Sequence, residues 1–217
     1  MFRAMLNVQW TWARMELAVY SAIAFVVPVL VLKAMYAARM EGAVGAALSA
    51  STGIGGFLAV LAFLAGVTLA ARPWILDNAR NHVLPLSLPI AWPRFVQLRF
   101  LAGATLVAVP AIAVWLGGLL AAMVIDIPAT LHVYPASIAL RFLGAGLVFY
   151  AIAFAIQYIG GRRAPMIVAS ALLAWLVLEV VSQALGFGSI TVGAWNLLST
   201  WPGPLEMITA RWMLVDV

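Results

Sequence analysis

The sequence predicts an all-α membrane protein, a bundle of helices that crosses the bilayer several times. Hydrophobic residues make up 66% of the 217 residues, charged residues only 9%, and the mean hydropathy is +1.10. An ordinary soluble domain has about 25% charged residues, and 12 basic plus 7 acidic side chains are too few to cover a soluble surface. A soluble domain, a disordered chain and a collagen-like chain are therefore excluded.

Five apolar stretches are long enough to span, since a spanning helix needs roughly 20 mostly apolar residues. The 11 Pro and 17 Gly are spread through these runs, as membrane helices tolerate. We expect the whole chain, 1–217, to form one transmembrane domain. The expected spans are Leu17–Ala38, Ser51–Ala71, a segment within Phe100–Ile125, Phe142–Ile159 and Ala164–Phe187.

Residues 1–15 read as an amphipathic helix that lies in the membrane interface, an elbow before the first span at Leu17. Apolar and polar side chains fall on opposite faces at 100° per residue, and only Gln9 sits on the wrong one. The alternative is that this segment is the wet end of one long first helix. The expected apolar face contains Phe2, Leu6, Trp10 and Ala13, with Met1, Met5, Val8 and Trp12 beside it; the polar face contains Arg3, Asn7, Thr11 and Arg14.

The C-terminal tail, 188–217, is expected to be an outer interfacial or re-entrant segment. It contains Trp195, Trp201 and Trp212, and Trp side chains favour the headgroup level. A sixth span from about Ile190 is the alternative, although it would have to cross the break at Pro202-Gly203-Pro204.

Basic residues near the ends of the spans predict a cytoplasmic N-terminus. With this orientation, eight Lys or Arg lie inside and four outside. The inside residues are Arg3, Arg14, Arg72, Arg80, Arg94, Arg99, Arg162 and Arg163; the outside residues are Lys33, Arg39, Arg141 and Arg211. The net charge of +5 is scattered, so it indicates orientation and contact with anionic lipid rather than nucleic-acid binding.

Sequence motifs for catalysis or metal binding are missing. The chain has no Cys, which excludes disulfides and thiolate sites. It lacks Gly-x-Ser-x-Gly and the phosphate-binding Gly-x-x-x-x-Gly-Lys-Ser/Thr, so we expect no enzyme activity and no cofactor in this chain. His82 and His132 fall on opposite sides of the membrane in this topology and cannot share a metal.

Glu179 is the most unusual residue of the fifth span. A carboxylate at this depth costs at least about 2.5 kcal/mol, so it must face other helices, water or a cation. Gln183 lies one turn further on the same face, and Arg141 is a plausible partner by depth. These residues either contact a substrate or proton, or form an ion pair that only supports packing.

The segment 72–99, between the second and third spans, should be cytoplasmic. Asp77, Arg80 and Asn81 suit a helix start exposed to water. The apolar residues that follow would be costly in water and need headgroups or a protein partner. They are Val83, Leu84, Leu86 and Leu88.

This layout resembles the membrane subunits of the ABC-exporter superfamily, in the group of drug, polysaccharide and lipid exporters. Residues 1–14 match the family's elbow helix, and the resemblance covers about residues 1–187. Asn81 stands where Gly is common in the family, but Asn also enters left-handed turns. The short coupling helix that precedes the third span is matched by Asp77, Arg80, Leu86, Leu88-Pro89-Ile90-Ala91, Arg94 and Arg99.

The resemblance implies a permease that pairs with itself or a sister permease and is driven by a separate ABC ATPase, which carries ATP and Mg²⁺. A lipid-like or amphiphilic substrate would suit the apolar lining. A non-catalytic structural or assembly subunit is the alternative, and an enzyme acting on lipid is a weaker one. The residues expected to couple to the ATPase are Asp77, Arg80, His82, Leu84, Leu86, Leu88, Pro89 and Arg94.

The fourth span contains Gly144 and Gly146, which would let another backbone approach closely. We expect this pair on a contact between two copies of the permease.

Overall fold

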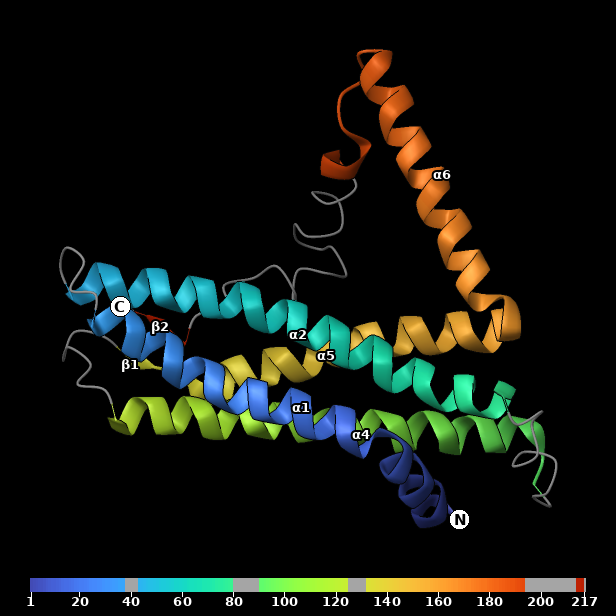
Figure 1. Ribbon diagram of the computed structural model, residues 1–217, viewed down its shortest axis with the longest axis horizontal. Coiled ribbons are helices and arrows are strands. Elements are labelled where there is room, and N and C mark those ends of the chain that lie inside the picture. The colour runs from blue at the N-terminus through green and yellow to red at the C-terminus, as the bar shows by residue number, and fades with distance from the viewer. Residues whose placement is uncertain (38–42, 80–89, 125–131, 194–213, 217) are drawn as a thin grey trace.

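The computed structural model describes residues 1–37, 43–79, 90–124, 132–193 and 214–216 (Figure 1). Within these ranges the chain is almost entirely helical. The long helices are α1 (Phe2–Ala37), α2 (Ala43–Ala79), α4 (Trp92–Val124), α5 (Pro135–Gly160) and α6 (Ala164–Ala184). The short elements are the 3-10 turn η1 (Gly161–Arg163) and the strands β1 (His132–Val133) and β2 (Val215–Asp216).

The expected all-α membrane bundle is confirmed, because five of the described helices are long and apolar enough to cross a membrane. Four of them extend beyond the predicted spans. The largest extension is at the start of α1, where amphipathic residues continue the helix past the apolar run. Helix α2 also extends at both ends, and α4 at its start. Hydropathy identifies the membrane-crossing part of a helix, whereas the helix itself ends where its backbone hydrogen bonding ends.

Helices α1, α2, α5 and α4 form a ring in which each packs against the next. Helices that follow one another along the sequence run in opposite directions. Helices α1 and α4 are therefore parallel to each other, as are α2 and α5 (Figure 1). This up-and-down arrangement brings the end of α2, the start of α4 and the start of α1 to the same end of the bundle.

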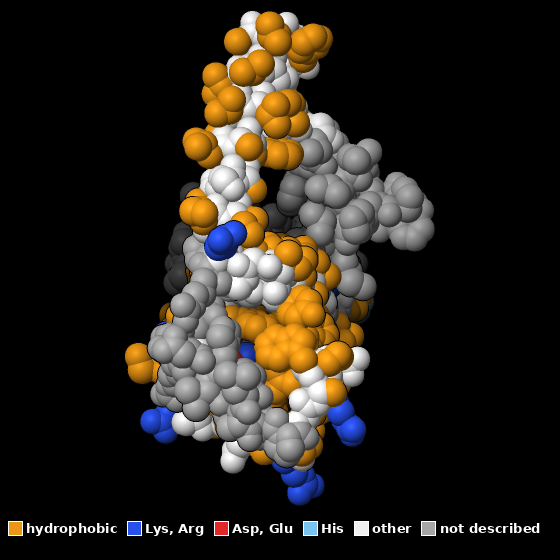
Figure 2. All heavy atoms as spheres, turned by 90° about the vertical axis from the view of Figure 1, so that its right-hand side faces the viewer, with side chains coloured by type: hydrophobic (Ala, Val, Ile, Leu, Met, Phe, Trp, Pro, Cys, Tyr) orange, Lys and Arg blue, Asp and Glu red, His pale blue; other side chains and the backbone are white. Residues whose placement is uncertain are grey.

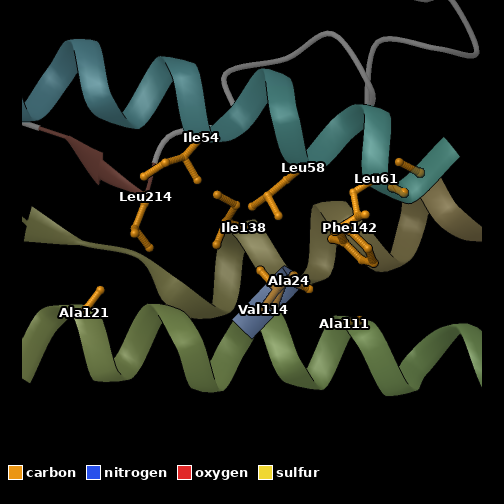
Figure 3. Close-up of a cluster of buried hydrophobic side chains, with 13 residues drawn as sticks. Ala24, Ile54, Leu58, Leu61, Ala111, Val114, Ala121, Ile138, Phe142 and Leu214 are labelled. Atoms are coloured by element: carbon orange, nitrogen blue, oxygen red, sulfur yellow. The ribbon is translucent and has the colours of Figure 1, made fainter. Parts of the chain in front are cut away.

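The middle of the ring is filled by a buried apolar cluster (Figure 3). Ile54 and Leu58 from α2 face Ile138 and Phe142 from α5, and all four side chains are at most 1% exposed. Small residues of α1 and α4 close the cluster: Ala24, Ala111, Val114 and Ala121. Interdigitation of this kind is what holds helices together in lipid, where association relies on packing rather than on water exclusion.

Glycines let two pairs of these helices touch through their backbones. A Cβ on Gly66 of α2 would lie 2.6 Å from the Gly146 carbonyl oxygen of α5. A Cβ on Gly117 of α4 would lie 2.3 Å from the Phe25 carbonyl oxygen of α1. Gly146 is therefore buried inside one chain, and the expectation that it lies on a contact between two copies is wrong.

The N-terminal segment is part of α1 rather than a separate helix. Helical hydrogen bonding continues through the predicted boundary at Leu17, and the N-terminal part of α1 bends away from the rest (Figure 1). One side of this segment packs against the bundle through Met5, Gln9 and Ala13, which are buried, while Phe2 and Trp10 are exposed.

Helix α6 projects from the ring instead of packing along it (Figure 1). It follows α5 through η1, whose first residue Gly161 has a φ of +51°, a conformation that favours glycine. Hydrophobic side chains are exposed on the face of α6 seen in Figure 2, and only 6% of the residues in its most apolar stretch are buried. In a membrane protein such a helix is covered by lipid or by another protein.

The described part of the C-terminal tail consists of two pieces. Residues 190–193 are helical, and β2 pairs with β1 in antiparallel register, His132 opposite Asp216. Leu214 is fully buried, and its carbonyl accepts a hydrogen bond from Tyr134 N–H at 2.9 Å. The chain therefore returns to the connection between α4 and α5; the predicted choice between a re-entrant segment and a sixth span falls on residues outside those described.

Candidate functional site

The most distinctive polar feature is an ion pair in the interior, between Asp77 near the end of α2 and Arg99 in the second turn of α4. Each residue is 1% exposed. The prediction that Asp77 begins a water-exposed helix is wrong, because α2 continues through Pro73 to Ala79 and turns Asp77 toward α4. A buried carboxylate needs a paired cation, and Arg99 supplies it.

Two aromatic rings enclose the Arg99 guanidinium. Its central carbon lies 4.3 Å from the centre of the Trp74 ring and 5.6 Å from that of Phe95. Both distances are within the range of cation–π attraction. Trp74 in turn packs on Phe154 of α5, with ring centres 5.6 Å apart, so the aromatic contacts around the Arg99 charge extend to α5.

Gln9 connects α1 to the same site. Its side-chain Nε2 donates a hydrogen bond to the Arg99 carbonyl oxygen at 2.9 Å, and the residue is 2% exposed. The polar residue that disturbs the apolar pattern of the N-terminal helix is thus one of its buried contacts. The bond links α1 to α4 at the position where α4 is linked to α2.

Several buried polar atoms of this cluster have no hydrogen-bond partner among the described residues. They are Arg99 Nε and Nη2, Trp74 Nε1 and Gln9 Oε1. An unsatisfied buried polar group costs about 1–3 kcal/mol. Natural interiors keep such groups few, and those that persist call for an explanation other than stability alone.

Tyr150 extends the polar network to α5. Its hydroxyl donates to the Phe100 carbonyl oxygen at 3.1 Å, next to Arg99 in sequence. Gly103 makes room for the tyrosine, since a Cβ there would lie 2.1 Å from the Tyr150 hydroxyl oxygen. Nothing in the sequence pattern distinguishes Tyr150 from the other aromatic residues of its helix.

A second, weaker ion pair lies close by along α1 and α2. Arg72 Nε and Glu16 Oε1 are 3.2 Å apart, with side chains 47% and 28% exposed. Partly exposed pairs of this kind contribute about 0–1 kcal/mol. The two pairs make the end of α2 the most polar part of the described bundle.

Of the other residues expected to couple to a partner, the structure describes only Arg94. Arg94 is exposed in the first turn of α4. The remaining ones, Arg80, His82, Leu84, Leu86, Leu88 and Pro89, lie outside the described residues. Asp77 and Arg99 therefore flank the predicted coupling segment on both sides, at the last turns of one helix and the first turns of the next.

Glu179 makes a separate cluster on α6. Gln183 Nε2 donates to Oε1 at 2.8 Å, and Thr191 donates its backbone N–H and its hydroxyl to Oε2, each at 2.9 Å. The predicted proximity to Gln183 is confirmed. The suggested pairing with Arg141 is not observed: the two ion pairs of the described residues involve neither side chain, and Arg141 Nη1 is buried without a hydrogen-bond partner.

No family model, no curated protein and no solved structure matches this chain. In the described part of the sequence, no three His, Asp or Glu side chains gather as a metal site would require. The buried polar residues there are Gln9, Asp77, Arg99 and Ser182, and Ser182 donates to the Gly188 carbonyl oxygen. What the Asp77–Arg99 cluster can do is hold the ends of α1, α2 and α4 in one fixed arrangement.

Proposed function

We propose that this chain is the membrane-spanning permease subunit of an ABC-type exporter in a bacterial cytoplasmic membrane. A separate ATPase subunit binds ATP and Mg²⁺, and the permease pairs with itself or with a sister permease. The observation that supports this proposal best is the buried Asp77–Arg99 pair, which joins the two helices on either side of segment 80–89. That segment is the part of the sequence that resembles a coupling helix.

The pair gives a physical route for force. In the proposed mechanism, closure of the ATPase dimer pushes on segment 80–89, and the helices tilt between inward-facing and outward-facing states. Because Asp77 and Arg99 bind each other directly, α2 and α4 move together rather than separately. Gln9 carries the same displacement into α1 through its bond to Arg99.

A lipid-like or amphiphilic substrate fits the surface between α4 and α5. A groove of about 290 Å³ opens there, and its lining is wholly apolar. Small side chains form its floor, which leaves space for an acyl or isoprenoid chain. The lining residues are Ala108, Ala111, Ile112, Trp115, Ala136, Ala139, Leu140 and Leu143.

The proposal is tested by purifying the tagged full-length chain from its native membranes in a mild detergent. We expect a protein with a phosphate-binding loop to co-purify, together with vanadate-sensitive ATP hydrolysis. Burying three leucine-sized side chains of segment 80–89 against that ATPase is worth roughly 5 kcal/mol before ordering costs. Leu84→Asp combined with Leu88→Asp should therefore release the ATPase while leaving insertion intact.

Leu84→Met with Leu88→Met is the matched control, because it keeps apolar side chains of similar size. The control should retain the ATPase at the wild-type ratio. Co-purification of an ATPase with the double aspartate variant at that same ratio would contradict the coupling role. Absence of any ATPase from the wild-type preparation would contradict the exporter itself.

A non-catalytic structural or assembly subunit is the second candidate, and α6 favours it. Leu172, Leu173 and Leu176 are each more than 60% exposed, and a partner protein could cover them. Such a subunit would co-purify with membrane proteins but without ATP hydrolysis. The same purification therefore separates the two functions.

A further inference from the structure

The bent N-terminal part of α1 and the middle of α4 enclose a second groove, of about 620 Å³. Its size lies within the range of about 300–1,000 Å³ that is typical of small-molecule sites. Unlike the groove between α4 and α5, this one is amphipathic. It is lined by Arg3, Leu6, Asn7 and Trp10 from α1 and by Thr105, Leu106 and Val109 from α4.

The polar groups of the groove come from one face of α1. Arg3, Asn7 and Trp10 are spaced by four and three residues, so they line up along the helix. All three are exposed. The ion pairs of the described residues join Arg72 to Glu16 and Arg99 to Asp77, so Arg3 has no carboxylate partner among them.

The apolar groups come mainly from α4. Leu106 and Val109 line the groove together with Thr105, whose hydroxyl donates to its own helix at Ala102 O, 2.7 Å away. The groove thus has a cation at one helix and hydrocarbon at the other. The N-terminal residues lie toward the end of the bundle at which α4 begins (Figure 1), so the cationic side is nearer the membrane surface.

We propose that this groove binds one anionic phospholipid, with its phosphate on Arg3 and Asn7 and an acyl chain along Leu106 and Val109. The guanidinium fork matches phosphate oxygens bidentately. Trp10 suits the headgroup level, where its ring packs on the glycerol region and its N–H bonds to ester oxygens. Among the described residues of the lining, the one charged side chain is cationic, which selects an anionic headgroup over a zwitterionic one.

The occupant rests on this charge complementarity and is independent of the exporter proposal. A bound lipid here would wedge between the bent segment and α4. It would therefore set the angle of the bend. Loss of the lipid site and loss of ATPase association are separate measurements, and either can fail alone.

The test uses the full-length chain, purified in detergent and incubated with mixtures of phosphatidylglycerol and phosphatidylcholine of equal acyl composition. Native mass spectrometry then counts the lipids that each chain retains. We expect one phosphatidylglycerol per chain to be retained in preference to phosphatidylcholine. Arg3→Gln should weaken this retention about tenfold, the effect of removing one hydrogen bond to a charged group.

Arg163→Gln is the matched control, because Arg163 is also exposed, lies in η1 at this end of the bundle (Figure 1), and does not line the groove. It should leave retention unchanged. Trp10→Phe should weaken retention less than Arg3→Gln, since the ring remains. Equal retention of both lipids by the wild type, or equal weakening by Arg163→Gln and Arg3→Gln, would overturn the proposal.

Discussion

The four-helix ring and helix α6 differ in what covers their apolar side chains. Both consist of apolar helices of membrane-spanning length. In the ring, large side chains such as Phe142 are completely buried by neighbouring helices of the same chain. On α6, Leu173 and Leu176 are 64% and 61% exposed. The ring is therefore closed within this chain, whereas α6 depends on lipid or on another protein for its surroundings.

The difference follows from local sequence. Gly66 and Gly117 bring ring helices into backbone contact, and the buried Asp77–Arg99 pair fixes their ends. After α5, Gly161 takes a positive φ and η1 redirects the chain, so α6 leaves the ring at its first residue. Packing in lipid rewards close approach, and α6 gains little of it from this chain.

The largest effect on the ring should come from Asp77→Asn. This change leaves the Arg99 charge buried without its counter-ion, and breaking one partner of a buried pair destabilises by roughly 3–5 kcal/mol. Unfolding by SDS titration in mixed micelles measures it. Glu16→Gln, in the partly exposed pair with Arg72, is the control and should lose about 1 kcal/mol or less.

Replacing both charged residues tests whether the unpaired charge causes the loss of stability in Asp77→Asn. Asp77→Leu combined with Arg99→Met removes the desolvation penalty along with the attraction, so stability should return to within about 1 kcal/mol of the wild type. If the double variant is as unstable as Asp77→Asn, the charges are not the reason for the loss.

The contrast between ring and α6 should appear next in core truncations. Phe142→Ala leaves a cavity in the cluster of Figure 3 and should cost about 3 kcal/mol, the low end for this change because lipid partly replaces water as the solvent. Leu173→Ala on α6 should cost about 0.5 kcal/mol or less. Thermal unfolding of the two variants in the same detergent decides the point; comparable losses would mean that α6 is packed within the chain.

Glycine substitutions give a smaller effect with opposite signs along one helix. Gly66→Ala forces α2 and α5 apart and should cost about 1–3 kcal/mol. Gly56→Ala, also on α2, meets nothing within 4 Å and should instead stabilise by about 0.5–1 kcal/mol, because alanine is the better helix former. If SDS titration gave equal changes in the unfolding free energy for both variants, close contact between helices would not be the cause of the change at Gly66.

The smallest effect on folding is expected for Glu179→Gln. The amide oxygen still accepts one hydrogen bond from Thr191 or Gln183, so the unfolding free energy should change little. Transport or stimulated ATP hydrolysis should nevertheless change, if the carboxylate meets a substrate or a moving charge. Unchanged activity would assign Glu179 to local packing between α6 and the segment at Thr191.

Composition and hydropathy were sufficient to predict the membrane class and the five helices, because burial in lipid leaves a long apolar run for each one. They misplaced the helix ends, because a helix continues through polar residues such as Asp77 when these residues bind an oppositely charged side chain inside the bundle. The same reason explains Gln9. Its polar side chain interrupts the apolar face predicted from the sequence. Only the position of α4 reveals the Arg99 carbonyl that Gln9 binds.

The candidate site was predictable in outline only. Asp77, Arg94 and Arg99 were singled out as part of one cytoplasmic segment, but a sequence gives no sign that two of them meet across 22 positions. Trp74 and Tyr150 were not identified at all, because buried aromatic residues are ordinary in an apolar helix. Gly146 was recognised as a contact residue, and the structure assigns that contact to α2 of the same chain.

The exporter proposal requires that the start of α4 face the cytoplasm. The chain has no native Cys, so single cysteines can be introduced without background. Ala91→Cys lies beside the start of α4, and His132→Cys lies in β1 at the other end; both positions are exposed. Intact cells are treated with a membrane-impermeant maleimide. We predict that Cys at 132 is labelled at once and Cys at 91 only after permeabilisation; the reverse pattern would contradict the orientation and, with it, access of an ATPase to segment 80–89.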